Sequence, residues 1–114
     1  MKAGAPCIPT RFELMHRCVE VKVDKSQGPH NLNRAEANYL LGLILLDPTV
    51  LDEELTTRRE ASQTFWHEAW HHMMNVLGEG DLAENEKLAD QFGGLMAQLM
   101  ATAEWGGPVS KEVG

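Results

Sequence analysis

The chain has few cysteines, few aromatic residues and no long apolar run. Two of its 114 residues are cysteine, one is tyrosine and three are phenylalanine. Two cysteines do not make the disulfide framework of a small secreted domain, so we expect both thiols to be reduced. The longest apolar run, residues 39–46, is too short to cross a membrane. Residues 1–6 lack the apolar segment of a signal peptide, and we therefore expect a cytoplasmic protein.

Basic residues are also scarce. Ten Lys and Arg stand against 17 Asp and Glu, which gives a formal net charge of −7. Phosphate binding depends on clustered Lys and Arg, so direct binding of nucleic acid is not expected from scattered ones. A chain of this length is expected to fold as one domain with a modest core. We place this domain at residues 10–105, after an irregular lead-in (1–9) and before a flexible tail (106–114).

The first half of the chain alternates between apolar and polar residues, which predicts a small sheet. Residues 10–24 are β-like and are interrupted once, so they make two short strands; a single helix over 10–18 is the competing interpretation. The turn-rich residues 25–34 predict a loop. Residues 37–46 predict another strand with a turn or bulge at Gly42, or else a short buried helix.

The second half predicts two helices. Residues 51–77 contain neither glycine nor proline and predict one long helix that stops at Gly78, and a second helix is expected over 82–104. The predicted fold is α+β, with a small antiparallel sheet followed by two long helices. Gly93 and Gly94 each cost about 1 kcal/mol in a helix relative to alanine, so we expect a close helix–helix approach there. The candidate core residues of the first helix are Phe65, Trp66, Ala69, Met73 and Leu77, and the second has an apolar stripe of Leu88, Phe92, Leu95 and Leu99.

A motif of the form H-E-x-x-H lies in the first predicted helix, at residues 67–71. His67 and His71 are four residues apart, so on a helix their imidazoles project from one face and can reach one metal ion. Glu68 is turned toward the same rim, where its carboxylate can contact a metal-bound water without binding the metal. Metal-assisted hydrolysis needs two neutral imidazoles, a carboxylate base and an open coordination position, which this spacing offers.

A second acidic motif follows in the second predicted helix. A catalytic zinc ion takes three protein ligands and a water, and Glu86 is the natural third ligand. Asp90 lies four residues further on and shares a helix face with Glu86. We expect the Asp90 carboxylate to accept the outer N–H of a ligand histidine, His67, and to fix its tautomer. The plainer interpretation is that these carboxylates form a solvated acidic helix face.

Together the two motifs resemble those of known metallopeptidases. H-E-x-x-H followed by N-E-x-x-x-D is similar to the gluzincin signature of the thermolysin type. The shorter spacing, with the run E-x-x-A-D-x-F at residues 86–92, is more similar to the small ImmA/IrrE-type metallopeptidases that are common in phages and prophages. The resemblance spans residues 10–104, and its specific motifs occupy residues 67–71 and 86–92.

This resemblance implies both a mechanism and a partner. His67, His71 and Glu86 would bind Zn²⁺, and Glu68 would be the general base that activates water for attack on a peptide bond. Characterised members of the family act with or on DNA-binding repressors, so the implied substrate is a protein or peptide such as a repressor. The last strand of the sheet is expected to flank the active-site helix and to offer its edge to an extended peptide.

Several further residues carry weaker expectations. A second donor for the oxyanion is suggested only by chemistry, with Tyr39, His16 and His30 as candidates. His72 is rotated by about 100° from His71 on a helix, and we expect it at the rim or on the surface.

Trp70 is large at a position where such motifs usually have a small residue. An indole that crowds the cleft would favour an alternative function, a zinc-binding regulatory module that contacts a partner without cutting it. A metal-free helical interaction protein is the third interpretation, and analysis of bound metal separates it from the other two.

Overall fold

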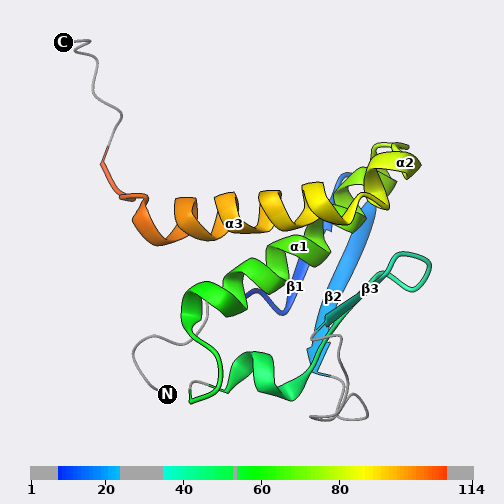
Figure 1. Ribbon diagram of the computed structural model, residues 1–114. Helices are drawn as coiled ribbons and strands as arrows, with labels where there is room; N and C mark the ends of the chain where they lie inside the picture. Colours follow the sequence, from blue (N-terminus) through cyan, green and yellow to red (C-terminus); the bar gives the residue numbers. More distant parts are fainter. Residues whose placement is uncertain (1–7, 24–34, 53, 108–114) are drawn as a thin grey trace, which may run out of the picture.

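The computed structural model describes residues 8–23, 35–52 and 54–107. Four strands form one sheet in the order β1-β2-β4-β3: β1 (Arg11–Leu14), β2 (Arg17–Val23), β3 (Ala35–Asn38) and β4 (Leu43–Leu46). They are followed by η2 (Pro48–Leu51), α1 (Arg58–Val76), α2 (Gly80–Ala83) and α3 (Glu86–Thr102). The predicted α+β fold, a small sheet followed by two long helices, is confirmed (Figure 1).

The sheet differs from the expected one in the direction of one strand pair. β1 pairs with β2 and β3 pairs with β4 in antiparallel fashion, but β2 and β4 are parallel. The parallel pair arises because the β3–β4 hairpin docks on β2 through its second strand. β3 is therefore an edge strand within the described part of the sheet.

Gly42 lies in the turn between β3 and β4, as predicted. Because these two strands occupy the segment, the alternative of a short buried helix over residues 37–46 is wrong. The Gly42 φ of +64° lies in the left-handed region, and a Cβ there would lie 2.7 Å from the carbonyl oxygen of Cys18. The Gly42 carbonyl also accepts a 2.9 Å hydrogen bond from the backbone N–H of Glu20. Only glycine combines this conformation with so close an approach to β2. The alternative of one helix over residues 10–18 is also wrong, because β1 and β2 occupy that segment.

The first long helix begins seven residues later than predicted, at Arg58 rather than at residue 51. Thr57 Oγ1 accepts the N–H of Glu60 at 3.1 Å, and the Glu60 carboxylate accepts the N–H of Thr57 at 2.9 Å. This capping box satisfies two N–H groups that have no partner inside the helix. The acidic residues after position 51 are a weaker start signal, because charge near a helix end contributes less than a cap.

The second predicted helix is divided in two. α2 ends at Ala83, and Asn85 caps α3 by accepting the N–H of Leu88 at 3.0 Å. Because α3 starts at Glu86, this residue lies in the first turn of the helix and beside α1. The helix ends at Thr102, close to the predicted end.

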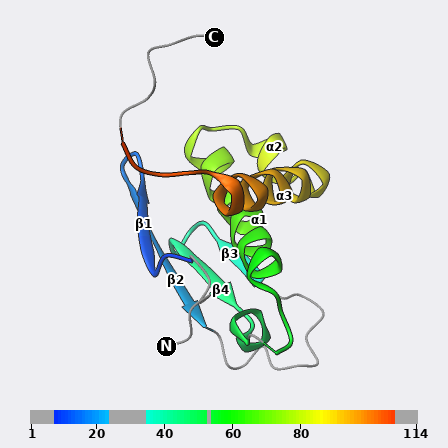
Figure 2. The same ribbon diagram turned by 90° about the vertical axis from the view of Figure 1, so that its left-hand side faces the viewer.

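α1 lies between the sheet and α3 (Figure 2). Phe65 and Ala69 belong to the core, as predicted, and Trp66 and Met73 pack against it. The prediction for Leu77 is wrong, because its side chain is 59% exposed near the end of α1. The sheet and the η2 segment supply the remaining large side chains of the core, which are Val19, Ile44, Leu46 and Val50.

α3 approaches α1 through small residues. Ala89, Gly93 and Ala97 are buried, whereas Leu95 and Leu99 of the predicted apolar stripe are 67% and 48% exposed. The face of α3 that packs on α1 is therefore the one with the small residues, and it lies next to the predicted apolar stripe. Small residues let the two backbones come closer than leucines would allow.

The predicted close approach of the helices is confirmed at Gly93. A Cβ on Gly93 would lie 2.7 Å from the carbonyl oxygen of Gln63 and 3.2 Å from the backbone N of His67. A Cβ on Gly94 would meet only the Gln63 side chain, at 3.7 Å. The contact at Gly93 brings α3 against the turn of α1 that carries His67.

The sequence predicted reduced cysteines, no membrane span and a flexible C-terminal tail. Cys18 is a free, exposed thiol on β2, and Cys7 lies outside the described residues. Within the described parts of the chain, every helix is too short or too polar to cross a membrane. The predicted tail at 106–114 lies almost wholly outside the described residues.

Candidate metal centre

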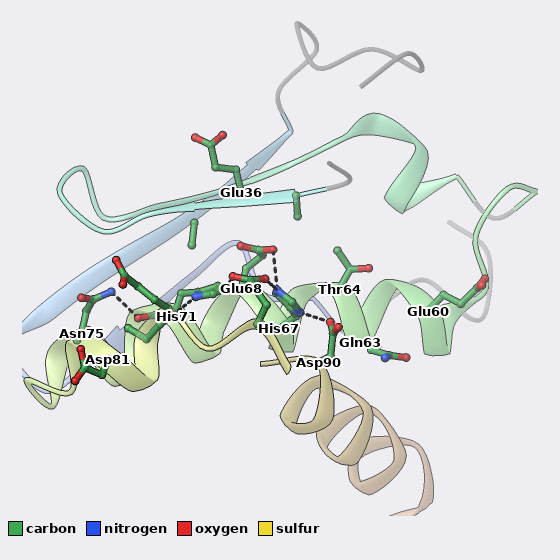
Figure 3. A pocket seen from close by; sticks show the side chains of 16 residues that line it. Glu36, Glu60, Gln63, Thr64, His67, Glu68, His71, Asn75, Asp81 and Asp90 are labelled. Carbon is green, nitrogen blue, oxygen red and sulfur yellow. Dashed lines mark hydrogen bonds and ion pairs between the residues drawn. The ribbon is translucent and has the colours of Figure 1, made fainter. Parts of the chain in front are cut away.

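Two histidines of α1 and one glutamate of α3 converge in space (Figure 3). The rings of His67 and His71 have centroids 5.1 Å apart. Glu86 Oε1 lies 2.9 Å from His67 Nε2, and Glu86 Oε2 lies 3.2 Å from His71 Nε2. One ligand atom from each residue lies within 4.8 Å of the other two. The structure thus brings together the three residues that the two motifs named as metal ligands.

The outer nitrogens of both histidines are held by acceptors. His67 Nδ1 lies 2.6 Å from Asp90 Oδ1, and His71 Nδ1 contacts the carbonyl oxygen of Ala83. A carbonyl or ionised carboxylate oxygen accepts, so the tautomer with its proton on Nδ1 satisfies both contacts. In a neutral imidazole this leaves the lone pair on Nε2. Asp90 therefore contacts His67, the histidine that the sequence predicted as its partner.

In this tautomer, three electron-pair donors face one point. The two Nε2 lone pairs and the Glu86 carboxylate would repel one another, unless a cation or added protons lay between them. Holding both rings as imidazolium would place two positive charges side by side on one helix face. A metal ion satisfies all three groups at once, and the cluster is therefore able to bind one.

Glu68 lies beside this cluster without being part of it. Its Oε2 is 3.8 Å from His67 Nε2, and only 9% of the residue is exposed. Burial, with a smaller effect of the Glu86 carboxylate, raises the pKa of the Glu68 carboxyl above its ordinary value. Positive charge on His67 or His71, and the N–H of Ala37 that donates to Glu68, act in the opposite direction. A carboxylate held in this way is placed to exchange a proton with a molecule bound next to the cluster.

The cluster lies in an open pocket of about 1200 Å³ between β3, α1 and the α2–α3 segment. Ala35 and Ala37 of β3 contribute to one wall. Figure 3 shows Glu60 at one end of the pocket and Asp81 at the other, with the histidines between them. The pocket therefore extends on both sides of the two histidines.

His72 is not the rim residue that helical rotation suggested. It is fully buried, and its Nε2 lies 2.8 Å from the carbonyl oxygen of Leu43 on β4. Burial lowers the pKa of His72, so the ring is neutral and Nε2 donates. His72 does point in a different direction from His71, but that direction is toward the sheet. The spacing of residues within a helix does not reveal on which side the sheet lies.

Trp70 does not crowd the pocket. Its indole Nε1 donates to the carbonyl oxygen of Leu82 at 3.0 Å, and its ring packs on Phe92 at a centroid distance of 5.2 Å. The side chain is not among those that line the pocket. Trp70 therefore connects α1 to α2 and α3. Its position gives no support to the alternative function, a zinc-binding regulatory module that does not cut its partner.

Two of the three candidates for an oxyanion donor, His16 and Tyr39, do not lie at the site. His16 is exposed in the turn between β1 and β2, and neither it nor Tyr39 lines the pocket. The ring of Tyr39 packs instead beneath the guanidinium of Arg17, 4.1 Å from the ring centroid. His30 lies outside the described residues.

Sequence reasoning missed three groups that shape the site. The carbonyl of Ala83 and the N–H of Ala37 are backbone groups, and no residue type signals their role. The Asn75 side chain donates to the carbonyl of His71 at 2.8 Å, which stabilises the end of α1. Its spacing of four residues from His71 was a signal that could have found it.

Comparison of the chain with protein-family models, with curated proteins and with solved structures gives no match. The geometry of the pocket and the two motifs therefore carry the functional assignment by themselves.

Proposed function

We propose that the protein is a zinc-dependent peptidase. His67, His71 and Glu86 bind Zn²⁺, and Glu68 acts as the general base. The observation that carries this proposal is the convergence of two Nε2 lone pairs and one carboxylate in an open pocket, with a separate buried carboxylate beside them.

The ligand set suits zinc in both chemistry and size. Two imidazoles and one carboxylate are a typical set for catalytic zinc, whose tetrahedral bonds of about 2.0–2.1 Å place the ligand atoms about 3.3 Å apart. Glu86 Oε1 lies 2.9 Å from His67 Nε2 and Glu86 Oε2 lies 3.2 Å from His71 Nε2. One ligand atom from each of the three residues lies within 4.8 Å of the other two, so small side-chain shifts would bring the set to that spacing. Bound zinc would lower the pKa of a water toward about 7 and polarise a peptide carbonyl.

Glu68 provides the proton transfer. Its carboxylate accepts a proton from the attacking water and returns it to the nitrogen of the leaving amine. The buried position of Glu68 beside the cluster suits this cycle, because a general base must lie within reach of the water that it deprotonates. The Ala37 N–H holds the carboxylate in place while this happens.

β3 is the proposed docking edge for the substrate. It is an edge strand in the described sheet, and Ala35 and Ala37 leave room beside the cluster. An extended polypeptide can add to such an edge through backbone hydrogen bonds. The substrate is therefore a protein or peptide, and the motif resemblance makes a DNA-binding repressor the first protein to try.

Removal of the metal tests the proposal. Purified protein is expected to contain one zinc per chain by elemental analysis and to cleave a mixture of randomised peptides, as followed by mass spectrometry. A chelator should abolish cleavage and lower the Tm, because a ligand that binds only the folded state stabilises it. Added zinc should restore both properties. Cleavage that survives complete removal of the metal, or no cleavage by zinc-loaded protein, would contradict the peptidase.

Asp90→Ala is expected to weaken zinc binding by about 10- to 100-fold, because the outer partner of a ligand histidine fixes its tautomer and orientation. A competition titration against a fluorescent zinc chelator measures the change. Asp81→Ala removes the same group from the same pocket without touching a histidine, and its affinity should stay within about threefold of the wild type. Equal affinities for the two variants would show that Asp90 does not support His67.

A further inference from the structure

The pocket is far more acidic than the chain as a whole. Seven of its 16 lining residues are Asp or Glu and none is Lys or Arg, whereas the chain has 17 acidic and ten basic residues in 114. Three of these acids, Glu68, Glu86 and Asp90, belong to the metal centre. The other four are Glu36, Glu60, Asp81 and Glu84.

A bound divalent cation does not neutralise this surface. Its two charges are offset by the acids of the metal centre itself, so the remaining carboxylates keep the pocket negative. Figure 3 shows Glu36 projecting away from His67 on the other side of β3. Glu60 and Asp81 lie at opposite ends of the pocket, and Glu84 joins Asp81 in lining it from the end of α2. Negative charge therefore stands on both sides of the metal centre.

We propose that the substrate is a basic polypeptide segment, with Lys or Arg on both sides of the cleaved bond. This inference rests on the proposed peptidase function and names its substrate class. A concave site lined by charges of one sign focuses the field and raises the local concentration of ligands of the opposite sign. Asp81 and Glu84 meet a basic side chain on one side of the metal centre. On the other side the charge of Glu60, whose carboxylate also accepts the N–H of Thr57, attracts one.

Asp81 and Glu84 are the residues that test this preference. Glu60 also forms the capping box of α1, so its replacement would disturb the fold as well as the charge. Asp81 and Glu84 are exposed and lie outside the metal centre. Asp81→Asn/Glu84→Gln removes two charges with little change of shape.

The experiment compares three pools of peptides with the zinc-loaded protein. Each pool is randomised except for two positions on either side of the bond, which hold Lys or Arg, Asp or Glu, or Ser. We expect kcat/KM for the basic pool to exceed that for the acidic pool by about tenfold or more at low salt. The difference should shrink at 0.5 M salt, because ions screen charges over about 4 Å at that strength.

The double variant should lower kcat/KM for the basic pool by about two- to tenfold, mainly through KM, and leave the Ser pool unchanged. Glu54→Gln/Glu104→Gln is the matched control, because it makes the same change in net charge outside the pocket. This control should cleave all pools as the wild type does. An equal loss in both double variants would show that only net charge matters and would overturn the assignment to Asp81 and Glu84.

A binding measurement separates the substrate class from the chemistry. Zinc-loaded Glu68→Gln protein should bind a fluorescent basic peptide more tightly than its acidic counterpart, as read by anisotropy. Cleavage of the basic and acidic pools at equal rates would overturn the inference and leave the peptidase intact. Failure to cleave any pool with zinc bound would overturn the peptidase, and equal binding of both peptides would then overturn the basic preference as well.

Discussion

Glu68→Gln is expected to lose peptide hydrolysis and to keep its zinc. General acid–base catalysis contributes about 10²–10⁴-fold, so kcat/KM should fall by about that factor. The metal should stay at one per chain, because Glu68 is not one of the clustered ligands. The glutamine oxygen can still accept the N–H of Ala37, which holds the carboxylate in the wild type. The fold should therefore be preserved.

Stability provides an independent check on the same variant. Burial raises the pKa of the Glu68 carboxyl, so the charged form is disfavoured at that place. In the metal-free protein, replacing it with a neutral amide should leave the Tm unchanged or raise it. Glu54→Gln is the matched control, since it makes the same substitution outside the pocket, and its kcat/KM should equal that of the wild type. A Glu68→Gln protein with the wild-type rate would remove Glu68 from the mechanism.

Gly93→Ala is expected to destabilise the fold by about 1–3 kcal/mol, whereas Gly94→Ala should stabilise it by up to about 1 kcal/mol. The added methyl group at Gly93 would lie 2.7 Å from the backbone carbonyl oxygen of Gln63 in α1. A backbone atom inside a helix cannot move aside by itself, so α3 as a whole would have to shift away from α1. At Gly94 the nearest atom is the end of a flexible side chain at 3.7 Å, so the gain in helix propensity decides the sign.

The same displacement should weaken metal binding. The methyl group at Gly93 would also press on the backbone N of His67, while Glu86 lies on the helix that is pushed away. Urea unfolding gives the free energies, and titration with a competing chelator gives the zinc affinities of both variants. Equal stabilities for Gly93→Ala and Gly94→Ala would show that the helices do not meet as closely as the structure places them.

The local geometry of the metal centre was largely predictable, because it follows from spacing on helices. His67 and His71 share a face by their separation alone, and Asp90 follows Glu86 by one turn. The acidic motif predicted that the second helix would bring Glu86 close to the two histidines. The glycine pair pointed to the close contact, although only Gly93 makes it.

What the sequence did not reveal depends on contacts between distant segments. The inward turn of His72 depends on where the sheet lies, and the outward turn of Trp70 depends on α2. The parallel pairing of β2 with β4 depends on which strand of the hairpin docks. The late start of α1 was visible in principle, since Thr57 and Glu60 have the spacing of a capping box.

The bond between Trp70 and the carbonyl of Leu82 bears on how a metal ion would bind to the cluster. It fixes the α2 segment on α1 through protein atoms alone, and the adjoining Ala83 carbonyl then orients His71. The coordinating groups are thus preorganised, so little of the binding energy is spent on arranging them. A metal ion that binds the cluster would therefore meet ligands that are already in place, and it could reach them through the open pocket.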